Sequence, residues 1–403
     1  MKKKLILSIV FACSLLTAFS QDKKTKRKAK LLANEAQYHF DNGDYGTAWT
    51  VYREVLRLDP GHQKAGLNAA VSMFNLNYPV DSAKTFEANL SASALPDAAY
   101  YLARIRHQQK SLDEAISLLT KYQGVNEKKR LHNNNDVNYL LAACTNARNF
   151  IAKPNKSIIK NMGPAVNSPY ADYVPVIVPD ESALYFTSKR ENQLHPRKNG
   201  DNNYFEDVYV CYKNAEGWSQ AENIGFPVNT ETNDGCVAVS PDGQRMIVYR
   251  TSEDVVSGDL YITRLGKNNR WEPLTLMPPE INSPDIETSA CFSNDTSEIY
   301  FSSNRPGGMG GKDIYRIRKL PKGNWSQPFN LGPAINTAYD EDAPFLHPDG
   351  VTLYFSSKGH NTMGEYDVFR SVLNPEENQF SPPENLGYPI NDVGNDIFFV
   401  LNV

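Results

Sequence analysis

The chain has 403 residues, of which 40% are hydrophobic and 22% are charged, and its formal net charge at pH 7 is −4. This composition is that of an ordinary globular protein, and it excludes both a wholly disordered chain and a strongly basic one that would bind nucleic acid. The length accommodates two or three domains.

Residues 1–20 have the organisation of a secretory signal peptide. Three lysines precede the apolar run Leu5–Phe19, and small residues lie three and one positions before a cut at Gln21. A run of about 15 apolar residues is short for crossing a bilayer. A lipoprotein interpretation would instead use Cys13 and would leave a very short apolar run, so we favour ordinary cleavage and export.

Residues 21–28 form a basic lead-in to the first helix. We interpret its basic residues as the solvent-exposed side chains of a segment that leads into a helix. Contact with anionic lipid head groups or lipopolysaccharide is the alternative.

Residues 29–151 change to a helical period and predict a helical domain. Small residues recur in pairs at spacings of 12, 13 and 12: Ala36 with Ala48, Ala70 with Ala83, and Ala103 with Ala115. Such residues let two antiparallel helices approach, so we expect three helix pairs, with Asp136–Phe150 as a capping helix. The pattern resembles the tetratricopeptide repeat, a unit of roughly 34 residues and two helices. The second copy departs from it at Asn75–Pro79.

A linker, residues 152–160, separates this domain from the rest, and the charge divides near it. Residues 21–154 carry a net charge of +6, whereas residues 155–403 carry −13. Two parts of opposite sign would suit two partners of opposite charge. The plainer interpretation is ordinary variation, with the acidic residues placed in turns.

The second domain, residues 161–403, is built from a repeated unit whose copies lie 52 to 62 residues apart. Three markers keep this period: an asparagine after valine or isoleucine (Asn167, Asn229, Asn282, Asn336, Asn391), an Asp-x-Tyr or Asp-x-Phe step (Asp207, Asp259, Asp313, Asp367) and a later aromatic residue (Trp218, Trp271, Trp325, Phe380). A unit of about 40–50 residues with four short strands is typical of a β-propeller blade. We place the Asp-x-Tyr step on the third strand, the aromatic residue near the outermost strand, and the extra chain Glu191–Phe205 in a surface loop.

These repeats resemble the PD40 (TolB-type) propeller repeat, most closely through NRPGG and DIY in the third copy and PDG and LYFSS in the fourth. With the helical domain, they resemble envelope proteins of Gram-negative bacteria that carry the same modules before an OmpA-like peptidoglycan-binding domain, among them a component of the type IX secretion system. That OmpA-like domain is not found in this sequence, so the resemblance implies peptidoglycan contact only where such a domain exists.

The predicted fold is therefore an α-solenoid followed by a propeller of four full blades and a partial fifth. The fifth contains only an innermost strand, Ile397–Leu401, and Lys156–Asn161 would supply it with one outer strand. Since the two central strands are lacking, we expect an open arc with an unpaired C-terminal strand, as in a truncated version of a longer protein. An exposed apolar edge of this kind promotes self-association.

Carboxylates that follow the marker asparagines are the candidate partner-binding residues: Asp172, Asp234, Asp285, Glu287, Asp340, Glu341, Asp342 and Asp396. In a propeller this segment leads into the innermost strand, at one mouth of the central channel. Several carboxylates there would bind a cation or a basic peptide. The more ordinary interpretation is that they accept hydrogen bonds from the backbone of neighbouring blades.

The sequence contains no recognisable catalytic motif. GxSxG, HExxH and a P-loop are absent, and Gly307–Gly311 precedes a strand, so we interpret it as a flexible hairpin turn. The cysteines after the signal peptide form no CxxC and are expected to be free and buried. We expect no enzymatic activity, no cofactor and no metal site.

The predicted function is a non-enzymatic scaffold in the periplasm, associated with the outer membrane, that holds envelope proteins or peptides. The alternatives are a carbohydrate- or peptide-binding propeller, or an enzyme whose catalytic domain is missing.

Overall fold

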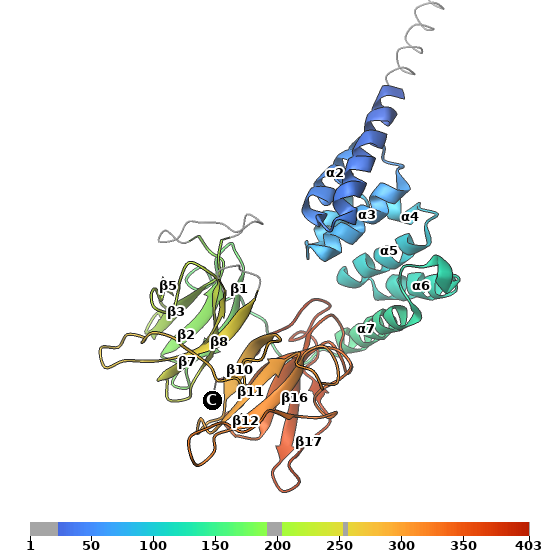
Figure 1. Ribbon diagram of the computed structural model, residues 1–403. Coiled ribbons are helices and arrows are strands. Elements are labelled where there is room, and N and C mark those ends of the chain that lie inside the picture. Colours follow the sequence, from blue (N-terminus) through green and yellow to red (C-terminus); the bar gives the residue numbers. More distant parts are fainter. Residues whose placement is uncertain (1–22, 192–203, 253–256, 403) are drawn as a thin grey trace, which may run out of the picture. The chain divides into compact units, whose positions relative to one another are not determined.

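The computed structural model describes residues 23–191, 204–252 and 257–402 (Figure 1). The predicted signal peptide and most of the predicted surface loop lie outside these ranges. The chain divides into two compact units, one ending at Arg148 and the other beginning at Asn149. Among the described residues, no helix combines the length and the apolar character that a membrane span requires.

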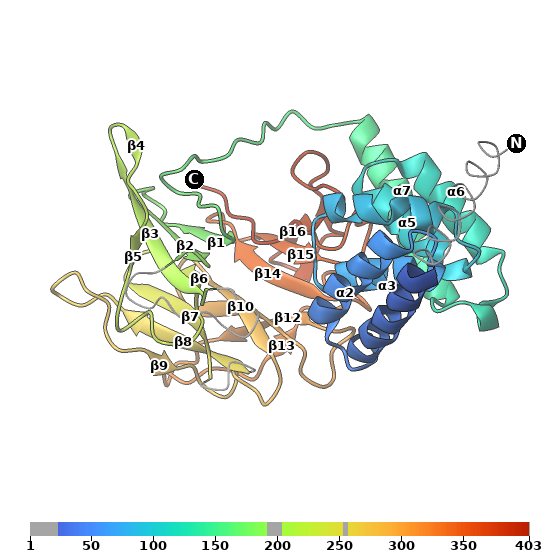
Figure 2. The same cartoon turned by 90° about the horizontal axis from the view of Figure 1, so that it is seen from above.

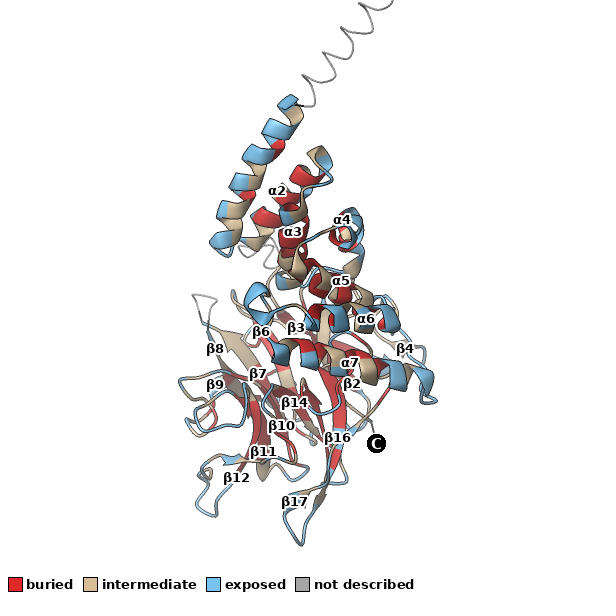
Figure 3. Ribbon diagram, turned by 90° about the vertical axis from the view of Figure 1, so that its right-hand side faces the viewer, coloured by how far each residue is buried: buried red, intermediate tan, exposed pale blue. Residues whose placement is uncertain are grey.

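The first unit is helical, as predicted. A first helix covers residues 23–41, so the basic residues 23–28 belong to it. The helices that follow are α2 (Tyr45–Leu58), α3 (Gln63–Asn75), α4 (Glu87–Ser91), α5 (Pro96–Gln108), α6 (Leu112–Gln123) and α7 (Asn134–Ala152), with short 3₁₀ helices at Val80–Thr85 and Glu127–Lys129. Figure 3 shows buried residues along α3 and α5.

The paired alanines explain why these helices pack. All six predicted packing positions are fully buried: Ala36, Ala48, Ala70, Ala83, Ala103 and Ala115. At the first turn, the Asp44 side chain accepts a hydrogen bond from the Thr47 backbone N–H at 3.0 Å and caps α2. Gly43 precedes this cap with a φ of +76°, a conformation that glycine adopts without steric cost.

The second helix pair is irregular, and the prediction of three regular pairs is wrong there. In place of a full second helix, the chain forms the 3₁₀ helix Val80–Thr85 and the five-residue α4. Asn77 takes a φ of 52°, and Pro79, which has no backbone N–H, stands at the N-cap. These two residues lie in the stretch where the sequence departs from the repeat.

The second unit is a four-bladed β-propeller, and each antiparallel sheet is one blade (Figure 2). Blade one contains β1 (Asp172–Ile177), β2 (Ala183–Ser188), β3 (Asp207–Asn214), β4 (Gly217–Trp218) and β5 (Glu222–Asn223); blade two contains β6 (Asp234–Val239), β7 (Arg245–Thr251), β8 (Gly258–Arg264) and β9 (Thr275–Leu276); blade three contains β10 (Glu287–Phe292), β11 (Glu298–Ser303), β12 (Asp313–Arg318) and β13 (Phe329–Asn330); blade four contains β14 (Glu341–Leu346), β15 (Thr352–Ser357), β16 (Asp367–Asn374), β17 (Gln379–Phe380) and β18 (Glu384–Asn385).

The repeat markers lie where they were predicted. Every marker aspartate is on the third strand of its blade, and Trp218 and Phe380 are on the short outer strands β4 and β17. Trp271 and Trp325 form isolated bridges to Leu265 and Lys319, just beyond the third strands. The innermost strands β1, β6, β10 and β14 lie next to one another in that order.

The glycine-rich loop connects β11 and β12, as predicted for a hairpin turn, and it is also held by hydrogen bonds. The Gly311 backbone N–H donates to the Tyr339 carbonyl at 3.1 Å, and the Met309 N–H donates to the Asp313 carboxylate at 2.6 Å. Gly310 lies so close to the backbone around Tyr339 that no Cβ would fit there. The glycines therefore allow the loop to pack on the connection that leads into blade four.

The C-terminal segment also differs from the prediction. Ile397–Leu401 is not a strand, and Lys156–Asn161 pairs with no strand among the described residues. Phe398 has a φ of 65°, matching Val174 and Ala343, which carry φ values of 51° where the innermost strands β1 and β14 bulge. The segment thus repeats the bulge of an innermost strand, but no second strand lies beside it to complete a ladder.

This segment runs between blade four and blade one. The Phe399 ring lies 5.1 Å from that of Tyr354 in β15, and the Asn402 amide donates to the Glu181 carboxylate in the β1–β2 turn. The segment is half-buried. The predicted C-terminal strand with an exposed apolar edge is therefore wrong for the described residues.

Candidate functional site

Four of the predicted carboxylates begin the innermost strands: Asp172, Asp234, Glu287 and Glu341. Each accepts a hydrogen bond of 2.6 to 2.9 Å from the backbone N–H four residues earlier, on Ser168, Thr230, Ser283 and Thr337 respectively. The hydroxyl groups of those same residues donate to the same carboxylates. The carboxylates therefore fix the turn that enters each blade.

In three blades an arginine completes the arrangement. Arg190, Arg250 and Arg305 pair with Asp172, Asp234 and Glu287 at 2.8, 2.5 and 3.2 Å. The same guanidinium groups donate to the carbonyl that precedes the marker asparagine, on Val166, Val228 and Ile281. Each arginine thus links the innermost strand to the loop before it. Its positive charge is paired with a carboxylate of the same blade.

Blade four lacks this arginine. His360 Nε2 donates to the equivalent carbonyl, on Ile335, at 2.9 Å, and no basic side chain pairs with Glu341 among the described residues. Burial raises the pKa of Glu341 to about 7, although hydrogen bonds from Ser357 and Thr337 act in the opposite direction. Burial also acts to raise the pKa of Asp172, but Ser188, Arg190 and Ser168 outweigh it, and that pKa is lowered.

Asp396 repeats the bond of the four carboxylates that begin the innermost strands, because it accepts the N–H of Asp392, four residues earlier, at 2.6 Å. The other three predicted residues lie in different surroundings. Asp342 is buried at the boundary of blades three and four, where it pairs with Lys312 and accepts a hydrogen bond from Ser289. Asp340 pairs with Lys358 at 3.1 Å, and Asp285 is half-buried. Apart from Asp285, these carboxylates are therefore bound by groups of the propeller itself.

The central channel is an apolar cavity of about 460 Å³. Residues of β1, β6, β10 and β14 line it together with Phe398–Asn402, and Glu206 is the one charged residue among the described residues of its wall. Within the described part of the chain, no group of three or more histidine, cysteine, aspartate or glutamate side chains is placed to hold a metal ion. The described cysteines, Cys144, Cys211, Cys236 and Cys291, are free and buried, as predicted.

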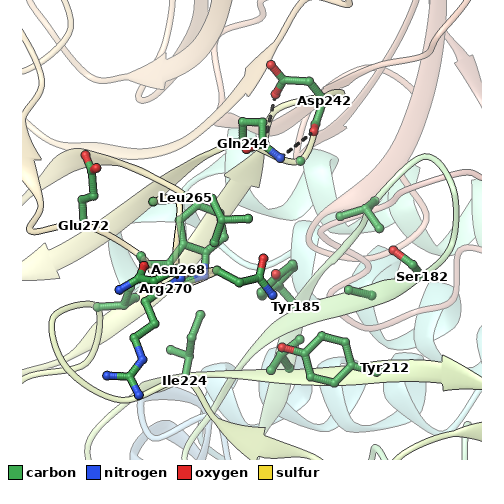
Figure 4. Close-up of a pocket in the computed structure, with 18 of the residues that line it drawn as sticks. Ser182, Tyr185, Tyr212, Ile224, Asp242, Gln244, Leu265, Asn268, Arg270 and Glu272 are labelled. Carbon is green, nitrogen blue, oxygen red and sulfur yellow. Dashed lines mark hydrogen bonds between the residues drawn. The ribbon is translucent and has the colours of Figure 1, made fainter.

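A larger site that was not predicted lies between blades one and two (Figure 4). We call it the inter-blade groove. Its volume is about 1270 Å³, and its walls come from the β1–β2 and β6–β7 turns, from β2, β3 and β5, and from the hairpin Leu265–Pro273. It is the candidate site of this protein.

Aromatic and amide side chains line the inter-blade groove together with charged and aliphatic ones. Trp271, from the blade-two hairpin, packs edge-on against Tyr185 of blade one, with ring centroids 6.1 Å apart at 76°. At this boundary a marker aromatic residue therefore packs two neighbouring blades together. Tyr212 also lines the groove and is 48% exposed, while Phe226 at its rim is 86% exposed. Asn223, Gln244, Asn268 and Asn269 supply the amides.

The carboxylates of the inter-blade groove are not equivalent. Asp180 accepts hydrogen bonds from the backbone and hydroxyl of Ser182, and Asp242 accepts them from Ser240 and from the Gln244 N–H, so both are turn residues. Glu222 of β5 and Glu272 of the blade-two hairpin are exposed, and neither carboxylate makes a hydrogen bond or an ion pair with another described residue. These two are therefore the groove carboxylates that no turn engages, and Glu222 is the one on the blade-one wall.

Comparison with known proteins gives no family assignment. No protein-family model matches the chain, and no curated protein matches it. Among solved structures, it is similar to the putative TolB from Agrobacterium tumefaciens, with 17% identity and a TM-score of 0.36 over 54% of this chain and 67% of that one. It is also similar to a glycosyl hydrolase from Bacteroides ovatus, with 10% identity and a TM-score of 0.37 over 54% and 71% of the two chains. The helical unit is similar to the first TPR of Spaghetti (RPAP3), with 18% identity and a TM-score of 0.25 over 31% of this chain and 95% of that one.

Proposed function

We propose that this protein is a non-enzymatic binding scaffold of the bacterial envelope, and that its propeller holds an extended segment of a partner protein in the inter-blade groove. The observation that carries this proposal is the groove itself, which is open, exceeds the roughly 300–1,000 Å³ of ordinary small-molecule pockets and is lined by aromatic and amide groups. A segment of several residues fills such a groove better than a small metabolite does.

The chemistry of the inter-blade groove also fits a polypeptide. Asparagine and glutamine side chains both donate and accept hydrogen bonds, as a peptide backbone requires. Exposed tyrosine and phenylalanine rings give a large contact area at low conformational cost, which is why aromatic residues are enriched at protein interfaces. The helical unit supplies a second binding platform.

We place the scaffold in the periplasm, beside the outer membrane. The support is the signal-peptide pattern of residues 1–20 and the resemblance of the repeats to envelope proteins, including those linked to type IX secretion. Envelope proteins or peptides are the partners that this location implies.

The test is affinity purification from envelope fractions with a matched pair of variants. Tyr212→Ala removes an exposed ring from the groove, and Leu276→Ala removes an exposed side chain of β9 that lies outside it. We expect the amount of co-purifying partner to fall at least tenfold with the first variant and to stay unchanged with the second. Equal retention by both would contradict the proposal, whereas elution by a free oligosaccharide would favour the carbohydrate-binding alternative.

A further inference from the structure

The boundary between blades three and four contains a buried arginine, whereas the equivalent position between blades one and two is a valine. Arg316 of β12 is only 5% exposed. Its Nη2 donates to the Asn378 side-chain oxygen, in the β16–β17 hairpin of blade four, at 3.2 Å. Its guanidinium carbon lies 5.9 Å from the Tyr300 ring centroid, and Nη1 lies 3.8 Å from the Glu298 carboxylate. An aromatic face, an amide oxygen and a carboxylate thus surround this guanidinium.

Strand register identifies the same position between blades one and two. Arg316 is paired with Tyr300 across β11 and β12, and Val210 is paired with Tyr185 across β2 and β3. Val210 therefore occupies the position of Arg316, with an equivalent tyrosine beside it. Residues paired directly across antiparallel strands project from the same face of the sheet.

The amide on the opposite wall is also present. Asn378 lies two residues before the marker Phe380, and Asn269 lies two residues before the marker Trp271. Both take the left-handed conformation, with φ values of 50° and 58°. Asn269 lines the inter-blade groove, so the blade-two hairpin offers its amide as the blade-four hairpin offers that of Asn378.

A carboxylate lies on the blade-one wall as well. Glu222 of β5 is paired with Val210, at the position where Phe329 of β13 is paired with Arg316. Tyr185, Asn269 and Glu222 therefore lie around Val210, at the position where blade three has its own guanidinium. Val210 and Tyr185 are 3% and 8% exposed and pack with Trp271. Glu222 and Asn269 are therefore the groups of this set that face the open groove. Lys267, Arg270 and Glu272 lie on the opposite hairpin, whose net charge is positive, so an incoming cation is favoured at the blade-one wall.

We propose that the inter-blade groove receives an arginine side chain of the partner polypeptide, which takes the place that Arg316 fills between blades three and four. This inference rests on the proposed function and names the chemistry of its ligand. A guanidinium suits the site better than an ammonium because it is planar, stacks on aromatic faces and donates to a carboxylate and an amide at the same time.

The test uses the full-length protein and two capped pentapeptides, Gly-Gly-Arg-Gly-Gly and the same peptide with citrulline, a neutral group of nearly the same shape. Dissociation constants come from saturation-transfer NMR at low ionic strength. We expect the arginine peptide to bind at least tenfold more tightly than the citrulline peptide. Equal binding of the two peptides, or binding of neither, would overturn the inference.

Three variants locate the interaction. Glu222→Gln removes the charge while keeping the shape, and we expect it to weaken arginine-peptide binding at least fivefold. Glu272→Gln, on the hairpin of the same groove, is the matched control and should change binding less than twofold. Val210→Arg fills the groove with an internal guanidinium and should abolish binding, provided that its circular dichroism and melting temperature remain those of a folded protein. Equal effects of Glu222→Gln and Glu272→Gln would contradict the site.

The two proposals fail in different ways. If partner capture depends on Tyr212 but the two peptides bind equally, the proposed function stands and the arginine inference is wrong. If partner capture is the same with and without the Tyr212 side chain, the proposed function is wrong, whether or not the two peptides bind differently.

Discussion

The Asn336 side chain binds both backbone groups of Ile314. Its Oδ1 accepts the Ile314 N–H at 2.8 Å, and its Nδ2 donates to the Ile314 carbonyl at 3.0 Å. Asn229, Asn282 and Asn391 make the same pair of bonds to Val208, Leu260 and Val368. The marker asparagine therefore ties the third strand of one blade to the connection that leads into the next.

Replacing this asparagine should destabilise the propeller. Asn336→Ala leaves two buried backbone groups of Ile314 without their partner, and each such group costs about 1–3 kcal/mol. We expect a loss of about 2–5 kcal/mol in the free energy of unfolding, measured by urea denaturation. Asn324→Ala, at an exposed position of the β12–β13 hairpin, should change it by less than about 0.5 kcal/mol. Similar losses of stability for both variants would show that the two hydrogen bonds of Asn336 do not contribute to the stability of the propeller.

Glu341 should make the propeller less stable at alkaline pH. Its folded-state pKa, about 7, is higher than the usual value of 4.5 for a glutamate side chain. The stability that it contributes is therefore fully present below about pH 4.5 and is lost as the pH rises through 7. Glu341→Gln remains neutral, so relative to wild type the variant should gain up to ~3 kcal/mol between pH 5 and pH 8. Melting curves of both proteins across this range test the prediction, and parallel pH profiles would contradict it.

The stability that Asp172 contributes should depend on pH in the opposite direction, so Asp172 serves as the control for Glu341. Its pKa is lowered in the folded state because Ser188, Arg190 and Ser168 outweigh the effect of burial. Its contribution to stability is present above the unfolded-state pKa and is lost as the pH falls through the folded-state pKa. Asp172→Asn should therefore destabilise the protein at pH 7 and cost less near pH 3. A cost that grows toward acid pH would refute this assignment.

The helix pairs should not tolerate a long charged side chain at their crossings. Ala115 and Ala48 are fully buried, so Ala115→Arg or Ala48→Arg forces an unpaired charge into a site with no free volume. We expect a loss of about 3 kcal/mol or more in the stability of the helical unit, followed by circular dichroism at 222 nm. Ala94→Arg, outside the helices, is the control. Unchanged melting of the Ala115 variant would count against the predicted packing.

The sequence predicted those parts of the fold that each repeat specifies locally. The marker asparagines recur because each accepts a backbone N–H of its own repeat, and Asp313 and Asp367 likewise accept the N–H groups of Met309 and Met363. The paired alanines recur because each helix crossing has its own close contact. The carboxylates were harder to interpret. A serine or threonine lies four residues before each of Asp172, Asp234, Glu287 and Glu341, and this spacing was the available sign that they bind their own turns.

The inter-blade groove and the C-terminal segment depend on relations between distant residues. Val210 becomes informative only once the strand register shows that it matches Arg316. Ile397–Leu401 has the composition of a strand, but a strand requires a partner, and the segment instead contacts Tyr354 and Glu181 of two different blades. Neither relation is encoded in the residues that immediately surround these positions.

The most direct test of the account is photo-crosslinking in cells, with p-benzoylphenylalanine in place of Phe226 at the rim of the inter-blade groove. Phe226 is 86% exposed, so the substitution should not disturb folding, and the same residue in place of Leu276 on β9 is the control. The account predicts a discrete crosslinked partner from position 226, absent from position 276, that is lost when Val210→Arg fills the groove. No adduct from position 226, or an equal adduct from both positions, would contradict the assignment of this groove as the binding site.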